Sequence, residues 1–191
     1  DMTILCLPDE AACDAVALAE GDASIRFIDA STAHRVDSDW VYGFPEMTAT
    51  QRGMIASASR IANPGCYPTG FLALAKPLIA SGMLPADSRL SVPAVSGYSG
   101  GGKSMIGVHD SGELAPQFSY GTSLSHKHLA EMTHYAGLTT PPIFMPSVGD
   151  FYAGMLVHLP LHADQFVGAV EANQLYQLYA DWYATAPLVR M

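Results

Sequence analysis

Apolar and polar runs alternate along the first sixty residues in a way that predicts strand, helix and strand. Residues 4–7 and 25–28 are short apolar runs, which are typical of buried strands. Residues 9–20 are rich in alanine, begin with two acidic residues and end near Gly21, a pattern that favours a helix. This order predicts a parallel sheet covered by helices, with ligands at the carboxyl ends of the strands. Those ends are residues 7–8 and 29–35.

Further along the chain the alternation becomes less regular. Helical spacing of apolar residues predicts a helix over residues 69–80, and we expect further helices over residues 48–58, 126–135 and 171–184. Strand-like runs occupy residues 90–96, 142–146 and 155–161. Helices and longer strands that do not alternate strictly predict an α+β domain with a mixed or antiparallel sheet. We place the boundary between the two predicted domains near residue 62.

Composition narrows the class of protein. The chain has 191 residues, is 49% apolar and 14% charged, and carries a net charge of −9. These values are typical of a globular protein and argue against a nucleic-acid partner. No apolar run is long enough to cross a membrane. Because the chain begins and ends inside apolar runs, we expect it to be an internal fragment of a longer protein.

The three cysteines have no metal-type spacing, and their odd number indicates free thiols in a reducing compartment. Cys6 lies in an apolar run and Cys13 in an alanine-rich helix, so we expect both to be small buried hydrophobic residues. Cys66 is different, because it lies in Asn63-Pro-Gly-Cys-Tyr-Pro-Thr-Gly70, directly before a predicted helix. Pro64 and Gly65 favour a turn, and a helix N-terminus favours an anion such as a thiolate. Cys66 is therefore the candidate nucleophile.

A second candidate cluster lies in Ser125-His-Lys-His-Leu-Ala-Glu-Met132. Ser125 is expected to cap the following helix, and His128 and Glu131 are three residues apart on one predicted helical face. A histidine near a reactive cysteine can act as base and then as acid. A surface role for these side chains is the alternative. A metal site built from His126, His128, Glu131 and His134 is a further, less favoured interpretation.

Residues 97–104, Gly-Tyr-Ser-Gly-Gly-Gly-Lys-Ser, match the phosphate-binding pattern G-x-x-x-x-G-K-[ST]. That pattern requires a buried strand before it and a long helix after it. Pro93 interrupts the preceding strand, and we expect residues 105–112 to be too rich in glycine for a helix. We therefore interpret the loop as one that lets backbone approach a nicotinamide ring or a substrate closely. A nucleoside triphosphate site is not expected.

Residues 29–35, Asp-Ala-Ser-Thr-Ala-His-Arg, follow the second predicted strand. Arg35 is one of nine basic residues, and its guanidinium matches phosphate or carboxylate oxygens bidentately. A surface ion pair is the alternative role.

With these motifs, the chain resembles the N-acetyl-gamma-glutamyl-phosphate reductases in their shorter bacterial form, which are related to the aspartate-semialdehyde dehydrogenases. The resemblance runs along essentially the whole chain. NPGCYPTG is the family's active-site signature, and DASTAHR, YGFPE, VSGYSGGGK and SHKHLAE support it. The resemblance implies an α/β fold: part of a Rossmann NADP-binding domain at 1–62, followed by an α+β catalytic and oligomerisation domain at 63–191. The family's glycine-rich fingerprint and its closing segment have no counterpart in this chain.

The resemblance also implies roles for individual residues. Cys66 would be the nucleophile and His128 the acid and base. Arg35 would bind the phosphate of the substrate, with Ser31 and Asn63 nearby, while His126 and Glu131 would contact or support the substrate. NADP would be faced by Leu7, Pro8, Ser99, Gly100 and Gly101. No metal is expected.

The implied reaction is the NADPH-dependent reduction of a small acyl phosphate through a cysteine thioester, in arginine biosynthesis. The implied enzyme is a cytoplasmic homo-oligomer without membrane or nucleic-acid partners. Two alternatives stay open. A hydrolase or acyltransferase would use the same cysteine and histidine without nicotinamide. A truncated fragment would be non-catalytic.

Overall fold

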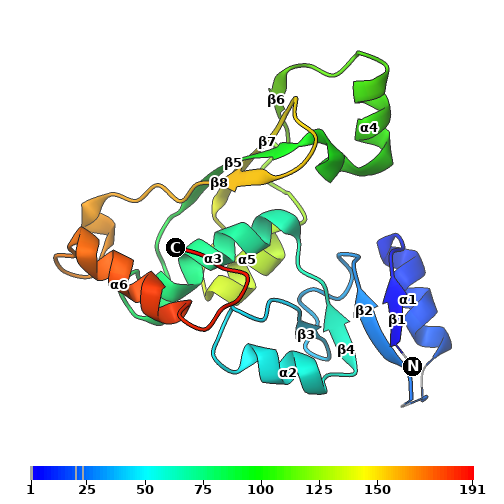
Figure 1. Ribbon diagram of the computed structural model, residues 1–191, viewed down its shortest axis with the longest axis horizontal. Coiled ribbons are helices and arrows are strands. Elements are labelled where there is room, and N and C mark those ends of the chain that lie inside the picture. Colours follow the sequence, from blue (N-terminus) through cyan, green and yellow to red (C-terminus); the bar gives the residue numbers. More distant parts are fainter. Residues whose placement is uncertain (1, 20, 23) are drawn as a thin grey trace. The chain divides into compact units, whose positions relative to one another are not determined.

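The computed structural model describes residues 2–19, 21–22 and 24–191. Its internal contacts divide the chain into two compact units. The first unit contains the residues up to Thr69 together with Ala172–Met191, and the second is Gly70–Glu171. Figure 1 shows the elements of both units. The division at residue 62 stays a prediction. A single boundary of this kind cannot describe the first unit, because the last twenty residues of the chain also belong to it.

The first unit contains a parallel sheet of four short strands in the order β1-β2-β4-β3. The strands are β1 (Met2–Leu5), β2 (Arg26–Asp29), β3 (Val41–Tyr42) and β4 (Arg60–Ala62). The parallel sheet expected from the alternation is confirmed. The sequence pattern did not predict β3 and β4, because two or three residues are too few to show a period.

Helix α1 (Asp9–Leu18) packs on this sheet through a core of Leu5, Ala12, Phe27, Trp40 and Ala62. The predicted helix included Glu20, which lies outside the described residues. Small side chains on α1 let the helix approach the sheet closely. This core explains why residues 11–19 are rich in alanine.

Three further predicted helices are present. They are α2 (Gln51–Ser57), α3 (Cys66–Ala80) and α6 (Ala172–Trp182). Helix α3 starts in the first unit and continues in the second, where Phe71, Leu72 and Ala75 are fully buried. No helix in the described part of the chain is long and apolar enough to cross a membrane.

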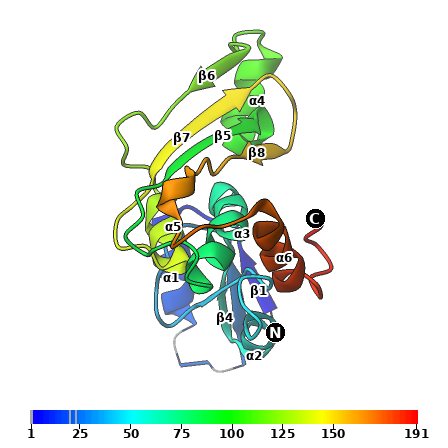
Figure 2. The ribbon, with the colours of Figure 1, turned by 90° about the vertical axis from the view of Figure 1, so that its left-hand side faces the viewer.

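The second unit contains a mixed sheet, one of the two kinds expected, and its strands follow the order β6-β7-β5-β8 (Figure 2). The strands are β5 (Ser91–Gly97), β6 (Gln117–Ser119), β7 (Ile143–Gly149) and β8 (Met155–Val157). Strands β5 and β7 are parallel, while β6 and β8 run antiparallel to their neighbours. Helix α5 (Leu129–Ala136) ends at Gly137, whose φ of 83° suits glycine at a helix end.

Three expectations about local structure were wrong. Residues Gly102–Asp110 form helix α4, although we expected the glycines there to prevent one. Gly102 has a φ of 71° at the start of this helix and Gly112 has a φ of 76° beyond its end, so only Gly107 weakens its interior. Cys6 and Cys13 are exposed free thiols and not buried residues.

Ser125 does not cap α5, contrary to expectation. Helix α5 begins three residues later than expected, with His128 at its N-cap position. The Ser125 hydroxyl instead bonds the Ser123 hydroxyl at 2.8 Å.

Candidate active site

Three segments with chemistry-bearing residues meet at the carboxyl edge of the first unit's sheet. The strand register places Leu5 opposite Asp29, and Asp29 opposite Ala62. The Ala30 N–H donates to the Leu5 carbonyl at 2.9 Å, and the Asn63 N–H donates to the Asp29 carbonyl at 2.7 Å. The segments that follow these strands therefore start side by side. They are residues 6–8, 30–35 and 63–66.

Cys66 is the first residue of α3 and is exposed. The Gly65 carbonyl before it accepts the Thr69 N–H at 3.0 Å and the Thr69 hydroxyl at 2.9 Å, which fixes the first turn. Tyr67 is buried, so the helix start is anchored next to a thiol that faces solvent. The predicted placement of Cys66 at a helix start is confirmed. The free N–H groups of a helix N-terminus favour negative charge there.

Arg35 is buried and ties the neighbouring segments together. Its Nε donates to the Asn63 carbonyl at 3.0 Å, and its Nη2 donates to the Ala30 carbonyl at 3.1 Å. The guanidinium therefore bridges the loop after β2 and the turn that leads to Cys66. Its positive charge lies at this edge of the sheet, and a guanidinium attracts phosphate and carboxylate oxygens. The alternative of a surface ion pair does not suit a side chain this buried.

Asp29 is fully buried beneath this loop and accepts three hydrogen bonds. They come from the Ser31 N–H at 2.9 Å, the Ser31 hydroxyl at 2.6 Å and His34 Nδ1 at 2.7 Å. Burial alone would raise the pKa of Asp29. The hydrogen bonds from Ser31 and His34 together outweigh burial and hold that pKa below its usual value. Ser31, a predicted substrate-binding residue, thus has a structural partner in Asp29.

Thr32 is a residue of this loop that the sequence did not single out. Its N–H donates to the Asp9 carboxylate at 2.8 Å, while its hydroxyl is buried and has no hydrogen-bond partner in the part of the chain that the structure describes. A buried hydroxyl without a partner costs roughly 1–3 kcal/mol unless a ligand or water pairs with it. Its position in a run of Ser and Thr at a strand end was the available signal.

The predicted catalytic and substrate-binding residues of the second unit cluster at the start of α5. His128 and Glu131 are buried, and His126 lies 4.6 Å from His128 between ring centroids. The His128 N–H donates to His126 Nδ1 at 3.1 Å, so neutral His126 carries its proton on Nε2. Burial, with the nearby charge of Lys127, lowers the pKa of His126. The surface interpretation of this cluster is therefore wrong for His128 and Glu131.

No three His, Cys, Asp or Glu side chains among the described residues are arranged to hold a metal ion. His134, one of the four candidate ligands, is exposed and lies edge-on to the Tyr135 ring. The metal interpretation of this cluster gains no support.

The glycine-rich loop after β5 is occupied by the chain itself. The N–H groups of Gly97, Tyr98 and Ser99 donate to carbonyls of residues 151–154 at 2.9–3.0 Å. A Cβ on Gly97 would lie 2.6 Å from the Phe151 carbonyl oxygen, so the close approach that requires glycine is internal. Helix α4 supplies the helix that the nucleotide pattern requires, but these three N–H groups of the loop are paired within the chain and are not open to a phosphate. Gly100 and Gly101 are exposed beyond these bonds.

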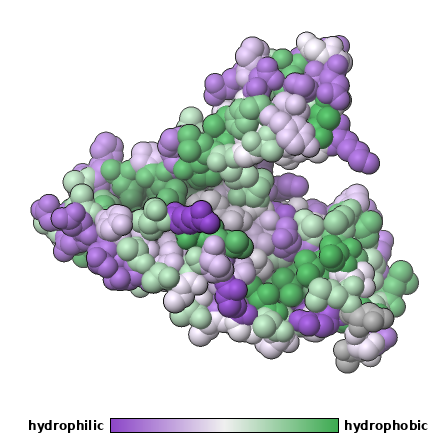
Figure 3. All heavy atoms as spheres, in the orientation of Figure 1, coloured by the Kyte–Doolittle hydropathy of each residue, from purple (hydrophilic) through white to green (hydrophobic). Residues whose placement is uncertain are grey.

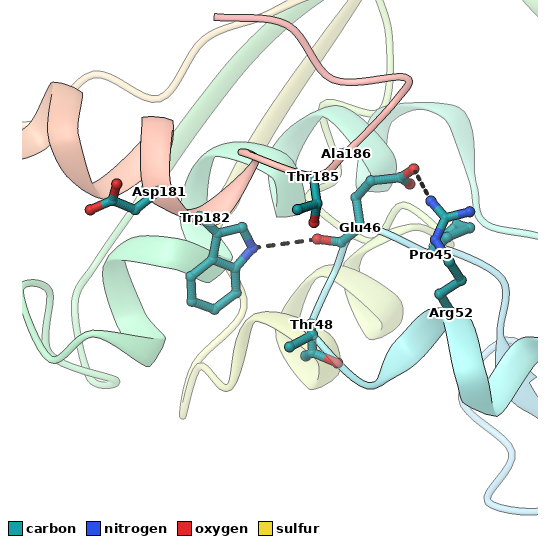
Figure 4. A pocket seen from close by; sticks show the side chains of 9 residues that line it. Pro45, Glu46, Thr48, Arg52, Asp181, Trp182, Thr185 and Ala186 are labelled. Carbon is teal, nitrogen blue, oxygen red and sulfur yellow. Dashed lines mark hydrogen bonds and ion pairs between the residues drawn. The ribbon is translucent and has the colours of Figure 1, made fainter.

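A separate cavity of about 430 Å³ lies in the first unit and contains none of the predicted site residues (Figure 4). Trp182 of α6 donates its indole N–H to the Glu46 carbonyl at 3.4 Å, and Arg52 pairs with the Glu46 carboxylate at 3.2 Å. Burial raises the pKa of Tyr179 to about 12. These contacts explain how α6 returns to the first unit.

Comparison with known proteins identifies the family. The family model of the semialdehyde dehydrogenase dimerisation domain matches residues 66–191. The chain therefore belongs to the semialdehyde dehydrogenase family. Its sequence is similar to that of N-acetyl-gamma-glutamyl-phosphate reductase 2 of Nostoc sp., with 46% identity over 199 residues. That alignment covers 100% of this chain and 62% of the relative, so the chain spans about three fifths of the relative's length.

Two solved structures share the fold. Aspartate semialdehyde dehydrogenase II from Vibrio cholerae matches with a TM-score of 0.66 at 18% identity, covering 93% of this chain and 59% of that one. The aspartate semialdehyde dehydrogenase from Candida albicans, solved with NADP, matches with a TM-score of 0.59 at 12% identity, covering 93% and 54%. These likenesses confirm the mixed α/β architecture.

Proposed function

We propose that the chain is the catalytic part of an NADPH-dependent reductase that converts N-acetyl-gamma-glutamyl phosphate to the semialdehyde and phosphate. This reaction belongs to arginine biosynthesis and takes place in the cytoplasm. The name of the 46% identical relative supports the substrate. The observation that carries the proposal is the exposed Cys66 thiol at the first residue of α3, beside the Arg35 loop.

Cys66 Sγ attacks the acyl carbon of the substrate. The carbon–oxygen bond to phosphate breaks, and a thioester on Cys66 and free phosphate result. N–H groups at the start of α3 stabilise the negative oxygen that develops during the attack. The Thr69 bonds to Gly65 keep this helix start rigid, so the stabilisation needs no rearrangement.

Arg35 binds the phosphate group before and after it leaves. Its bonds to the Asn63 and Ala30 carbonyls hold the guanidinium at the carboxyl edge where the Cys66 turn begins. Asn63 is exposed at that edge. Ser31 keeps the loop in place through Asp29. The unpartnered Thr32 hydroxyl adds a donor that a phosphate or carboxylate oxygen can satisfy.

NADP is the cofactor that the family resemblance and the NADP-bound Candida albicans enzyme suggest. Leu7 and Pro8 fit this role because they are exposed at the carboxyl edge of a parallel sheet, where such folds bind ligands. Ser99, Gly100 and Gly101 would hold the nicotinamide half. When bound, NADPH supplies the hydride that reduces the thioester.

His128 protonates the negative oxygen that reduction leaves on the former carbonyl carbon. It takes this proton back when the carbon–sulfur bond breaks and the aldehyde leaves Cys66. The histidine is buried at the start of α5, where His126 fixes its backbone N–H. His126 stays neutral near pH 7 because its pKa is lowered. The buried Glu131 on the first turn of α5 supports the cluster electrostatically.

We also propose that the chain forms a homo-oligomer through the outer face of the second unit's sheet. Met145 lies opposite Pro93, and Leu156 lies opposite Val95, so these four side chains share one face. Met145 and Leu156 are each 55% exposed. An exposed apolar sheet face favours association, in agreement with the matched dimerisation domain.

The test is to follow NADPH absorbance after N-acetyl-gamma-glutamyl phosphate is added to the protein. We expect NADPH oxidation that is lost in Cys66→Ser and kept in Cys6→Ser, which removes another exposed thiol of the same unit. Phosphate release without NADPH oxidation would instead indicate a hydrolase. Turnover by Cys66→Ser at the normal rate would contradict the proposal.

A further inference from the structure

A second cluster of reactive side chains lies within the first unit, away from Cys66. His34 is 7% exposed and contacts Asp29 and Cys13 with its two ring nitrogens. Its Nδ1 lies 2.7 Å from Asp29 Oδ2, and its Nε2 lies 3.8 Å from Cys13 Sγ. The His34 ring also stacks on Trp40 at 4.1 Å, with an interplanar angle of 15°. Packing and hydrogen bonding therefore fix the imidazole in one orientation.

The Asp29 contact determines which nitrogen of His34 carries the proton. Asp29 is a carboxylate, because its pKa is held below the usual value, and a carboxylate can only accept. His34 Nδ1 must therefore donate. In neutral His34 the lone pair is then on Nε2, which faces the Cys13 thiol. A thiol, a histidine base and an orienting carboxylate in this order are the arrangement that activates a nucleophilic cysteine.

The thiol of this cluster is open to small molecules. Cys13 is exposed and opens onto a cavity of about 210 Å³, which is lined by Cys13, Val16, Ala17, His34 and Arg60. Arg60 gives this cavity a cation in a chain whose net charge is −9. The proposed reduction uses neither Cys13 nor His34.

We propose that Cys13 is a second reactive thiol, which forms a mixed disulfide with small disulfides that bear carboxylates. His34 Nε2 takes the Cys13 proton, and the thiolate attacks one sulfur of the disulfide. The sulfur–sulfur bond of the reagent breaks as the new bond to Cys13 forms. The leaving thiolate takes the proton from His34 and departs as a thiol. Cys13 is oxidised, the reagent is reduced, and Arg60 attracts the reagent's carboxylates.

The test uses oxidised glutathione with the full chain at neutral pH, followed by acid quenching and peptide mass spectrometry. Cys6 serves as the internal reference, because it is an exposed thiol to which no described residue makes a hydrogen bond. A positioned general base typically speeds a reaction by about 10²–10⁴-fold. We therefore expect the mixed disulfide to form at Cys13 at least about ten times faster than at Cys6. Equal rates at Cys13 and Cys6 in the unaltered chain would overturn the proposal, and this comparison needs no variant.

Two variants separate the parts of the cluster. His34→Gln should bring the Cys13 rate down to that of Cys6, with circular dichroism confirming the fold. A folded His34→Gln chain that keeps the fast rate would contradict the role of the histidine. Arg60→Gln should slow the reaction with oxidised glutathione and leave the reaction with neutral 4,4′-dithiodipyridine unchanged. Equal effects on both reagents would contradict the selection of carboxylates.

Discussion

At the scale of single residues, Asp29 contributes both to the stability of the first unit and to the shape of its loop at residues 30–35. The carboxylate is fully buried, and three hydrogen bonds from Ser31 and His34 stabilise its charge. Those bonds shape the loop that carries Thr32 and Arg35. One buried carboxylate thus orders the loop to which we assign phosphate binding.

Replacing Asp29 with Asn should lower the free energy of unfolding by roughly 2–3 kcal/mol, because charge-assisted hydrogen bonds are lost in a buried site. The pKa of Asp29 is lowered in the fold, so its contribution is present above the unfolded value near pH 3.9 and is lost as pH falls through the folded value. Urea denaturation measures both effects. Asp22→Asn is the control, because the exposed Asp22 carboxylate accepts hydrogen bonds from Ser24 alone among the described residues. Equal stability of the two variants would contradict this account.

The lowered pKa of His126 predicts that stability also changes with pH in a second range. Burial and the charge of Lys127 lower its pKa, so the unfolded chain binds a proton below about pH 6.5 that the folded chain rejects. Stability should therefore fall as pH drops from 7 towards 5. In His126→Gln this loss should be smaller, as urea denaturation at both pH values would show. His158→Gln, which alters an exposed histidine, should keep the full loss.

At the scale of elements, the sequence predicted secondary structure best where an apolar repeat is long enough to recognise or where turn-forming residues mark the start of a helix. The turn at Pro64 and Gly65 and the apolar spacing beyond it were sufficient to place a helix start at Cys66. Helix α4 was missed because glycine content was counted without regard to position, and two of its glycines lie at or beyond the helix ends. Strands β3, β4 and β6 are set by pairing with neighbours that are distant in sequence.

The junction of β5 with the loop of residues 151–154 provides a test at this scale. Gly97→Ala should be strongly destabilising, because its Cβ would lie 2.6 Å from the backbone oxygen of Phe151. Gly107→Ala in α4 is the matched control, since no described atom outside the neighbouring helix backbone lies within 4 Å of its Cβ. Alanine there should raise stability by up to about 1 kcal/mol. Thermal unfolding compares the two variants, and a tolerated Gly97→Ala would refute the close approach.

At the scale of the whole molecule, two units share the residues that we assign to one reaction. Cys66, Arg35 and Ser31 belong to the first unit, and His126, His128 and Glu131 belong to the second. No local pattern in the sequence indicates that Ala172–Met191 returns to the first unit, because the contacts of Trp182 with Glu46 join residues that are 136 apart. Apolar side chains are exposed in both units (Figure 3).

Placing a charge on the outer face of the mixed sheet tests whether the chain associates through that face. Met145→Glu should shift the protein towards the monomer in size-exclusion chromatography with light scattering, because a buried unpaired charge opposes association. Met54→Glu, at a similarly exposed methionine of α2, should leave the mass unchanged. If Met145→Glu keeps the oligomer, the outer face of this sheet is not the interface.

Intact-protein mass spectrometry tests, without any cofactor, whether Cys66 forms an acyl thioester with an acyl phosphate. After the protein is mixed with N-acetyl-gamma-glutamyl phosphate, we expect one added N-acetylglutamyl group, mapped to Cys66 by peptide analysis and released by hydroxylamine. Cys66→Ser should remain unmodified under the same conditions, while Cys6→Ser should be acylated like the parent chain. Acylation that persists in Cys66→Ser, or an unmodified Cys66 in the parent chain, would contradict the account.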